Sequence, residues 1–257
     1  MATTGSKFVW YELMTTDVAA AAKFYADVIG WKAQKSPMPN MDYMLFNAGA
    51  TQVAGAFALS PEQLGHGAPK AWVGYVGVPN VDRAAADLKA AGGQVWRGPD
   101  DISGVGRFAM VSDPQGAAFA LFNSARPEEG SPADVGKPGH VGWHELYAGD
   151  GASAFDFYAP QFGWVKGDAM DMGAAGKYQI FGPAAGTMIG GIMTKPAQMA
   201  VPAWLFYFNV PSIEAAVPKI KSGGGQVANG PMEVPGGQWI VRGIDPQGAH
   251  FALTGAK

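Results

Sequence analysis

Two glutamates and one histidine are the residues of this sequence whose type and place could do chemistry. Glu12 and Glu145 occupy the same place in two similar segments, Phe8-Val-Trp-Tyr-Glu-Leu13 and Val141-Gly-Trp-His-Glu-Leu146. Inside a partly apolar cleft, a carboxylate can act as a general base with a raised pKa or bind a metal ion, and His250 could pair with either glutamate. We therefore predict Glu12, Glu145 and His250 as candidate catalytic residues. The alternative is structural, with carboxylates bonded to backbone or water and a histidine satisfied within the fold.

The other histidines do not form a metal-binding motif. His140 and His144 are four residues apart on a predicted strand, which at about 3.3 Å per residue separates them by about 13 Å. His144 also points to the opposite strand face from Glu145. His66 lies in a predicted loop.

Paired aromatic residues favour ligand binding. Trp10 and Trp143 lie two residues before the glutamates and therefore on the same strand face. Aromatic walls with few polar groups suit a planar or hydrophobic ligand held by stacking, although plain core packing is the alternative. The predicted ligand-binding residues are Trp10, Trp143, Tyr43, Tyr178, Tyr75 and Tyr207.

These pairs belong to an internal repeat. Trp10 and Trp143 are 133 residues apart, and Asp113-Pro-Gln-Gly116 returns 132 residues later as Asp245-Pro-Gln-Gly248. A register this constant over most of both halves indicates a tandem duplication. We predict one domain at 1–125, a Pro- and Gly-rich linker at 126–138 and a second domain at 139–257.

Helices with capping residues must position these strands. The first helix is predicted from Thr16 or Asp17 to Ile29, with Gly30 in the left-handed conformation. Its counterpart in the other half is predicted from Asp150 to Gly163.

A second type of helix follows Asn80 and ends at Gly92-Gly93, and its counterpart runs from Ser212 to Ser222-Gly223. Pro218 lies inside that last helix, where an interior proline costs about 3 kcal/mol, so we expect a kink or a break.

The strand pattern predicts two unlike sheet faces. Phe251 and Leu253 share one face of a strand, and His250 and Ala252 share the other. We expect the bulky face to pack against helices and the reverse face to leave a cavity for a ligand.

The composition narrows the classes of function. The 257 residues are 48% hydrophobic and 15% charged, which allows a sizeable core. A net charge of −3 with scattered basic residues argues against nucleic-acid binding. The absence of cysteine excludes disulfides and cysteine-based metal sites. With no apolar run that could span a bilayer and no signal-peptide pattern, we expect a cytoplasmic protein without membrane contact.

The sequence resembles the vicinal oxygen chelate superfamily in three features. These are the order of its elements, the Phe-Tyr…Gly-Trp ending of the opening helix and the closing Asp-Pro-Gln-Gly motif. That group includes glyoxalase I, bleomycin-resistance proteins and extradiol dioxygenases, and the likeness is greatest to two-domain glyoxalase-like proteins. The resemblance implies an α+β fold of tandem βαβββ modules, two per half and four in all. It also implies curved mixed sheets that enclose clefts, with the helices outside.

The resemblance further implies a divalent metal held by about four His, Glu or Gln side chains, acting as a Lewis acid. At the positions that match those ligands, this sequence has apolar residues or glycine. These residues are Trp10, Val73, Ala120 and Gly55 in the first half and Trp143, Leu205, Ala252 and Gly190 in the second.

Three interpretations remain open. The first is a small-molecule binder without a cofactor, the second a metal-dependent lyase, isomerase or dioxygenase with a non-standard site of Glu12, Glu145 and His250. The third is an interaction protein with vestigial clefts. We favour the first, in a monomeric pseudo-dimer or a homodimer, with a divalent metal as the alternative.

Overall fold

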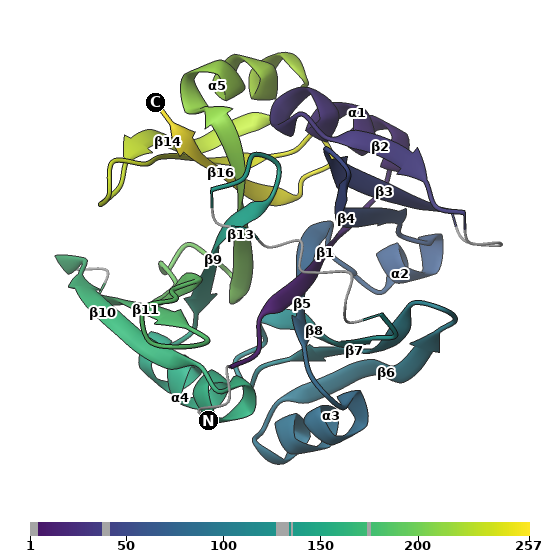
Figure 1. Cartoon of the computed structure of the whole chain (residues 1–257), viewed down its shortest axis with the longest axis vertical. Helices are drawn as coiled ribbons and strands as arrows, with labels where there is room; N and C mark the ends of the chain where they lie inside the picture. Colours follow the sequence, from purple (N-terminus) through teal and green to yellow (C-terminus); the bar gives the residue numbers. More distant parts are fainter. Residues whose placement is uncertain (1–4, 38–41, 127–133, 135, 174–175) are drawn as a thin grey trace. The chain divides into compact units, whose positions relative to one another are not determined.

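The computed structural model describes residues 5–37, 42–126, 134, 136–173 and 176–257. A βαβββ module occurs four times along the chain (Figure 1). The first comprises β1 (Phe8–Thr15), α1 (Val18–Ile29), β2 (Lys32–Lys35), β3 (Tyr43–Ala48) and β4 (Thr51–Ala58), followed by the short α2 (Pro61–Gly65). The second comprises β5 (Ala71–Gly77), α3 (Val81–Ala90), β6 (Gln94–Ile102), β7 (Gly106–Ser112) and β8 (Ala118–Ser124).

The second half repeats this order. The third module comprises β9 (Val141–Ala148), α4 (Gly151–Phe162), β10 (Val165–Asp171), β11 (Lys177–Gly182) and β12 (Gly190–Thr194). The fourth comprises β13 (Ala203–Ser212), α5 (Ile213–Ser222), β14 (Gln226–Glu233), β15 (Trp239–Ile244) and β16 (His250–Ala256). The predicted α+β fold of four such modules is therefore confirmed.

Each half contributes one eight-stranded mixed sheet. The strand orders are β2-β3-β4-β1-β5-β8-β7-β6 and β10-β11-β12-β9-β13-β16-β15-β14. In each module the first strand pairs in parallel with the last, as β1 does with β4 and β13 with β16, while the remaining pairs are antiparallel hairpins. This topology brings the opening strand of a module beside its closing strand.

The predicted caps position the opening helices. The Asp17 side chain accepts a hydrogen bond from the Ala20 amide at 2.9 Å, and α1 ends at Gly30 with φ 92°. Asp150 likewise begins α4, which ends at Gly163 with φ 67°. A Cβ strains this left-handed conformation, so glycine is favoured at both ends.

Pro218 does not break its helix. α5 continues to Ser222, with Ser212 as its N-cap and Ile213, Ala216 and Ile220 buried. The predicted break is wrong because this buried apolar face outweighs the hydrogen bond that the proline ring removes.

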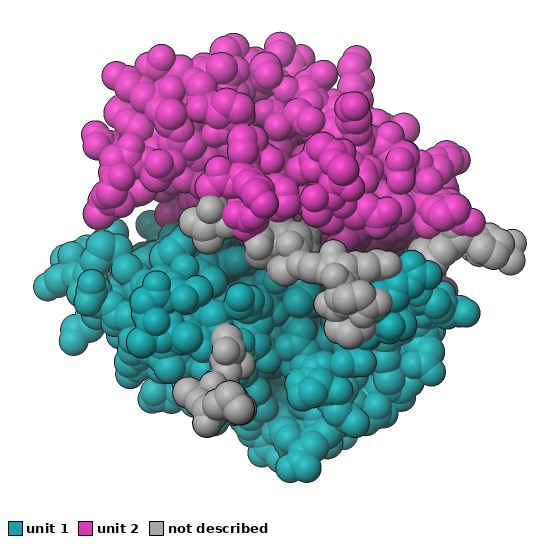
Figure 2. All heavy atoms as spheres, viewed as in Figure 1, with its two compact units in different colours: residues 1–9, 74–131, 143–205 teal, residues 10–73, 132–142, 206–257 magenta. Residues whose placement is uncertain are grey.

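The chain forms two compact units (Figure 2). Unit 1 contains Met1–Val9, Gly74–Ser131 and Trp143–Leu205, and unit 2 contains Trp10–Val73, Pro132–Gly142 and Phe206–Lys257. Each unit therefore combines one module from each half of the sequence. The predicted division at 1–125, 126–138 and 139–257 follows the repeat and stays a prediction; most of its linker, 127–133 and 135, lies outside the described residues.

A buried hydrogen-bond relay joins the two modules of unit 2. The Trp72 indole N–H donates to the Tyr25 hydroxyl at 2.8 Å, and Tyr25 donates to Asp245 Oδ2 at 3.0 Å. Asp245 Oδ1 accepts from the amides of Gln247 and Ala249, both at 2.9 Å. The Tyr25 side chain therefore anchors the Asp-Pro-Gln-Gly turn of the other sequence half.

The same relay occurs in unit 1. Trp204 donates to the Tyr158 hydroxyl at 3.2 Å, and Tyr158 donates to Asp113 Oδ2 at 3.1 Å. Burial raises the pKa of Asp113 above its usual value and raises the pKa of Tyr158 well above 10. The Phe-Tyr and Asp-Pro-Gln-Gly motifs thus have a structural role in holding modules together.

Candidate functional site

The opening strand β1 separates a buried face from a partly exposed one. Tyr11 and Leu13 are completely buried, whereas Trp10 and Glu12 are half-buried. The alternation matches the strand period, so Trp10 and Glu12 share one face. This face carries the side chains that the sequence predicted as a site.

A chain of hydrogen bonds connects Trp10, Tyr43 and Glu12 in unit 2. The Trp10 indole N–H donates to the Tyr43 hydroxyl at 3.0 Å, and the Tyr43 hydroxyl donates to Glu12 Oε1 at 2.8 Å. Burial and the nearby Glu12 carboxylate raise the pKa of Tyr43 well above 10. The phenol is therefore neutral and supports the carboxylate as a donor.

Gly55 makes room for this arrangement. It lies directly opposite Glu12 in the parallel pairing of β1 with β4. The Tyr43 ring lies so close to Gly55 that a Cβ there would collide with its hydroxyl and ring carbons. A glycine inside a strand often marks such a close approach, and this is the sequence signal that could have located the contact.

Unit 1 contains a second copy of the indole–phenol contact. The Trp143 indole N–H donates to the Tyr178 hydroxyl at 2.7 Å, and the Tyr178 ring lies against Gly191. Gly191 is opposite Glu145, a buried residue that is 4% exposed. The glycine matched to Gly55 from the sequence, Gly190, is one residue away from the true counterpart, Gly191. The error arises because insertions within the modules change the offset between equivalent residues of the two halves.

The predicted reverse face is not empty along the later strands. Leu205, Tyr207 and Asn209 are all buried, as are the small residues Ala120 and Ala252. The expectation of an open face lined by small residues is therefore wrong at these positions, because neighbouring side chains cover them.

The two remaining predicted tyrosines are held by different partners. Tyr207 accepts a hydrogen bond from Arg242 Nε at 3.0 Å. Tyr75 is buried and packs edge-on against Phe122, with ring centroids 6.1 Å apart. These contacts hold both side chains against their own sheets, and both tyrosines are buried.

His250 and His144 lie in different environments. His250 is exposed at the start of β16, opposite Ile244. His144 is buried on the other face of β9 from Glu145, stacks on Phe8 with ring centroids 4.3 Å apart and contacts the Ile189 carbonyl through Nδ1 at 2.6 Å. Burial lowers the pKa of His144 to about 4. It is thus a neutral core residue near pH 7.

The donor set for a metal ion is poor. Within the residues described by the structure, no group of three or more His, Cys, Asp or Glu side chains lies close enough to hold one. The phenol of Tyr43 also covers the strand at Gly55, one of the positions that the family resemblance assigned to a metal ligand. The residues present do not fit a divalent metal bound in the manner of that family.

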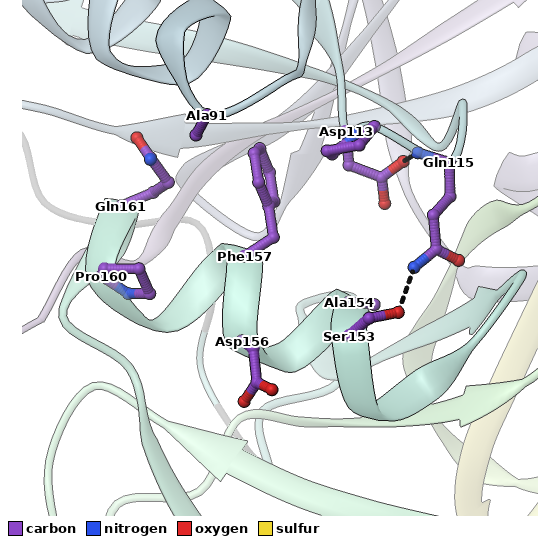
Figure 3. A pocket seen from close by; sticks show the side chains of 10 residues that line it. Ala91, Asp113, Gln115, Ser153, Ala154, Asp156, Phe157, Pro160 and Gln161 are labelled. Carbon is purple, nitrogen blue, oxygen red and sulfur yellow. Dashed lines mark hydrogen bonds between the residues drawn. The ribbon is translucent and has the colours of Figure 1, made fainter.

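A surface pocket of about 370 Å³ lies elsewhere in unit 1 (Figure 3). Helix α4 contributes Phe157, Asp156 and Gln161 to its lining. Gln115 Nε2 donates to the Ser153 hydroxyl at 3.1 Å and fixes the turn beside the helix. None of the residues predicted as a site lines this pocket.

The longest helices in the described part of the chain have 12 residues, and none is long and apolar enough to cross a bilayer.

Comparison with known proteins identifies relatives along the whole chain. A family model described as "Glyoxalase/Bleomycin resistance protein/Dioxygenase superfamily" matches residues 7–121 and 137–253. The putative glyoxylase CFP32 of Mycobacterium tuberculosis (strain CDC 1551 / Oshkosh) is 32% identical over 247 residues, which cover 95% of this chain and 92% of that protein. The anthracycline biosynthesis protein DnrV of Streptomyces peucetius is 32% identical over 259 residues, covering 95% of this chain and 91% of DnrV.

Solved structures share the fold at lower identity. The Mn(II)-bound glyoxalase from Novosphingobium aromaticivorans superimposes with a TM-score of 0.67 at 18% identity, covering 98% of this chain and 82% of that one. The 2,3-dioxygenase LapB from Pseudomonas sp. KL28 gives a TM-score of 0.68 at 13% identity, covering 99% and 94%. At these identities the likeness concerns the fold alone.

Proposed function

Because the chain belongs to the glyoxalase/bleomycin resistance protein/dioxygenase superfamily, we propose that it binds a small organic molecule without a divalent metal. The binding faces are those that carry Trp10 with Glu12 and Trp143 with Glu145. The observation that carries this proposal is the hydrogen-bonded set of Trp10, Tyr43 and Glu12, in which Trp10 occupies a position that the family resemblance assigned to a metal ligand.

The chemistry of this set favours binding. The half-buried indole of Trp10 offers a flat apolar surface for stacking, and the Glu12 carboxylate offers a polar contact that fixes orientation. A metal ion needs several oxygen, nitrogen or sulfur ligands, and an indole or a glycine supplies none. No catalytic step is therefore assigned to a metal.

A thermal-shift screen combined with metal analysis tests this proposal. The probes are planar aromatic compounds, including an anthracycline, since the name of the relative DnrV makes that class reasonable. A ligand that binds only the folded state raises the melting temperature, and at 100-fold excess over Kd it stabilises by about 2.7 kcal/mol. We expect a shift in the wild type that Trp10→Phe and Trp143→Phe diminish, and less than a tenth of a metal ion per chain.

The other outcomes each favour one of the two alternative interpretations. Stoichiometric Mn, Fe, Ni or Zn in the purified protein would favour the metal-dependent enzyme built on Glu12, Glu145 and His250. Neither metal nor thermal shift would favour an interaction protein. The control variant is Trp96→Phe, which replaces a tryptophan on β6 that is 66% exposed and lies outside the predicted site.

A further inference from the structure

We infer that the surface pocket of unit 1 is a separate ligand site, which takes a small organic cation with an apolar body, such as an amine or an amidine. The pocket lies among α4, the end of α3 and the turn at Asp113 (Figure 3). The inference is independent of the proposed function, because the pocket contains none of the residues of the Trp10 and Trp143 faces.

The pocket has the size and the lining of a small-molecule site. Its volume is about 370 Å³, and ligand pockets typically measure about 300–1,000 Å³. Part of its lining is apolar, contributed by Ala91, Pro114, Ala154, Phe157 and Pro160. The rest is polar, so a ligand that fills this pocket needs both an apolar body and a polar group.

Asp113 is the polar residue that selects the ligand. It lines the pocket although it is only 1% exposed, so the pocket reaches a buried carboxyl group. Its described donors are the amides of Gln115 and Ala117 and the hydroxyl of Tyr158, all of them neutral. Burial raises the pKa of Asp113, and an ammonium group in the pocket would supply the opposite charge that favours the carboxylate.

The other charges near the pocket leave this preference in place. Asp156 is its second acidic residue, although the carboxylate points away from the pocket in Figure 3, and no basic residue lines it. The basic residues of α3, of β10 and of the segment before β1 are Lys7, Arg83, Lys89 and Lys166. Two of them are engaged in an ion pair with Asp87 and a cation–π contact with Phe155. Lys7 and Lys89 are exposed, so water and salt screen their charges.

Comparison of the two copies explains why the pocket is open in unit 1. Ala91 caps α3, and the residue in the same place after α5 is Gly223. A Cβ on Gly223 would lie 2.9 Å from Phe24 Cδ2, so the glycine makes room for the Phe24 ring, which is 2% exposed. Ala91 cannot give that room to Phe157, the counterpart of Phe24, and Phe157 is 9% exposed. The alanine therefore helps to keep the pocket open.

Three probes of one size test the inference: benzylammonium, benzyl alcohol and benzoate. Binding is followed by NMR of the full-length 15N-labelled protein at the amide signals of Gln115 and Ala117, because both amides donate to Asp113 Oδ1 at 2.9 Å. We expect benzylammonium to bind about tenfold more tightly than benzoate, with benzyl alcohol in between. Equal or tighter binding of benzoate, or no movement of the two signals with any probe, would overturn the inference and leave the proposed function standing.

A change at the rim of the pocket shows where the probe binds. Ala91→Leu fills part of the pocket without touching the donors of Asp113, and it should weaken benzylammonium binding about fivefold or more. Ala86→Leu on the exposed side of α3 is the matched control and should leave the affinity unchanged. Unchanged affinity in Ala91→Leu would contradict the inference.

A change at Asp113 shows what sets the preference. Asp113→Asn keeps the shape but removes the charge, and it should bring the affinities for benzylammonium and benzoate within about threefold of each other. Because Asp113 also bonds to Tyr158, circular dichroism checks that this variant folds. The full preference in a folded Asp113→Asn would overturn the inference, and if the variant does not fold, Ala91→Leu decides alone.

Discussion

At the residue scale, the two equivalent tryptophans, Trp10 and Trp143, each donate an indole N–H hydrogen bond to a tyrosine hydroxyl. The donor–acceptor distance is 3.0 Å for Trp10 with Tyr43 and 2.7 Å for Trp143 with Tyr178. Because both phenols are buried, the indoles are held in one orientation on their strands. This fixed orientation is what a stacking site needs before a ligand arrives.

Removal of either phenol should therefore be visible at one indole only. In Tyr43→Phe the Trp10 N–H signal should move upfield, and its hydrogen exchange should quicken, because its acceptor is gone. Tyr178→Phe should do the same to the Trp143 signal. NMR with 15N-labelled tryptophan measures both, and unmoved signals would show that these hydrogen bonds do not persist in solution.

His144 should make the protein sensitive to acid. Its pKa is about 4 in the folded chain, because of burial, against 6.5 for an ordinary histidine. As the pH falls, His144 takes up a proton near pH 6.5 in the unfolded chain but only near pH 4 in the folded chain. The free energy of unfolding therefore decreases as the pH falls from 6.5 to 4. At 1.36 kcal/mol per pKa unit, the loss is about 3 kcal/mol.

The variant His144→Phe keeps a ring to stack on Phe8 but cannot take a proton. Urea unfolding at pH 7.5 and pH 4 should show the wild type losing about 3 kcal/mol more than the variant. Parallel losses in the two proteins would mean that His144 does not remain neutral in the folded state.

At the element scale, the relay from a tryptophan through a tyrosine to an aspartate fixes the turn before the last strand of each half. Tyr158→Phe leaves a buried oxygen of Asp113 and the indole N–H of Trp204 without their partner. Each unsatisfied group costs about 1–3 kcal/mol, so we expect a loss of about 2–6 kcal/mol in the free energy of unfolding. Tyr25→Phe should cost a similar amount in unit 2.

Denaturant unfolding of the two tyrosine variants measures this loss. Phe157 is adjacent to Tyr158 on α4 but has no hydroxyl, so the variant Phe157→Leu is a control for general loss of packing. A loss below about 0.5 kcal/mol in Tyr158→Phe would show that the relay does not hold the turn.

The features predicted correctly from the sequence are local ones. Asp17 before α1 and Gly30 after it act on the backbone within four residues, so their types alone mark the ends of the helix. The repeat places a matching helix between Asp150 and Gly163 for the same reason.

The features missed from the sequence depend on long-range register. The contact of Tyr43 with Gly55 and Glu12 requires the pairing of β3, β4 and β1, which no spacing in the sequence specifies. The burial of Tyr207 likewise could not be read from strand alternation, because alternation says which residues share a face and not what covers it.

At the scale of the whole molecule, each compact unit is made from both halves of the sequence. Tyr25 from the first half bonds to Asp245 from the second, and the Trp31 indole donates to the Gly139 carbonyl at 2.7 Å, both within unit 2. Neither half of the sequence therefore contains a complete unit. The repeat describes the ancestry of the chain, while the units describe its packing.

Fragments 1–125 and 139–257 should accordingly fail to fold alone. Each would expose apolar surface that the partner module covers, and each would lose one member of one relay and two members of the other. Circular dichroism and size-exclusion chromatography should show unfolded or aggregated fragments when they are expressed singly and a folded complex when they are expressed together. Two cooperatively folding fragments would contradict this interpretation of the units.

The central claim is that binding at these aromatic and carboxylate faces needs no metal ion. Calorimetric titration of the best planar ligand from the thermal-shift screen tests it most directly, once in buffer with EDTA and once with added Mn(II). The account predicts the same Kd in both titrations and weaker binding in Trp10→Phe. Binding that disappears in EDTA and returns with Mn(II) would contradict it.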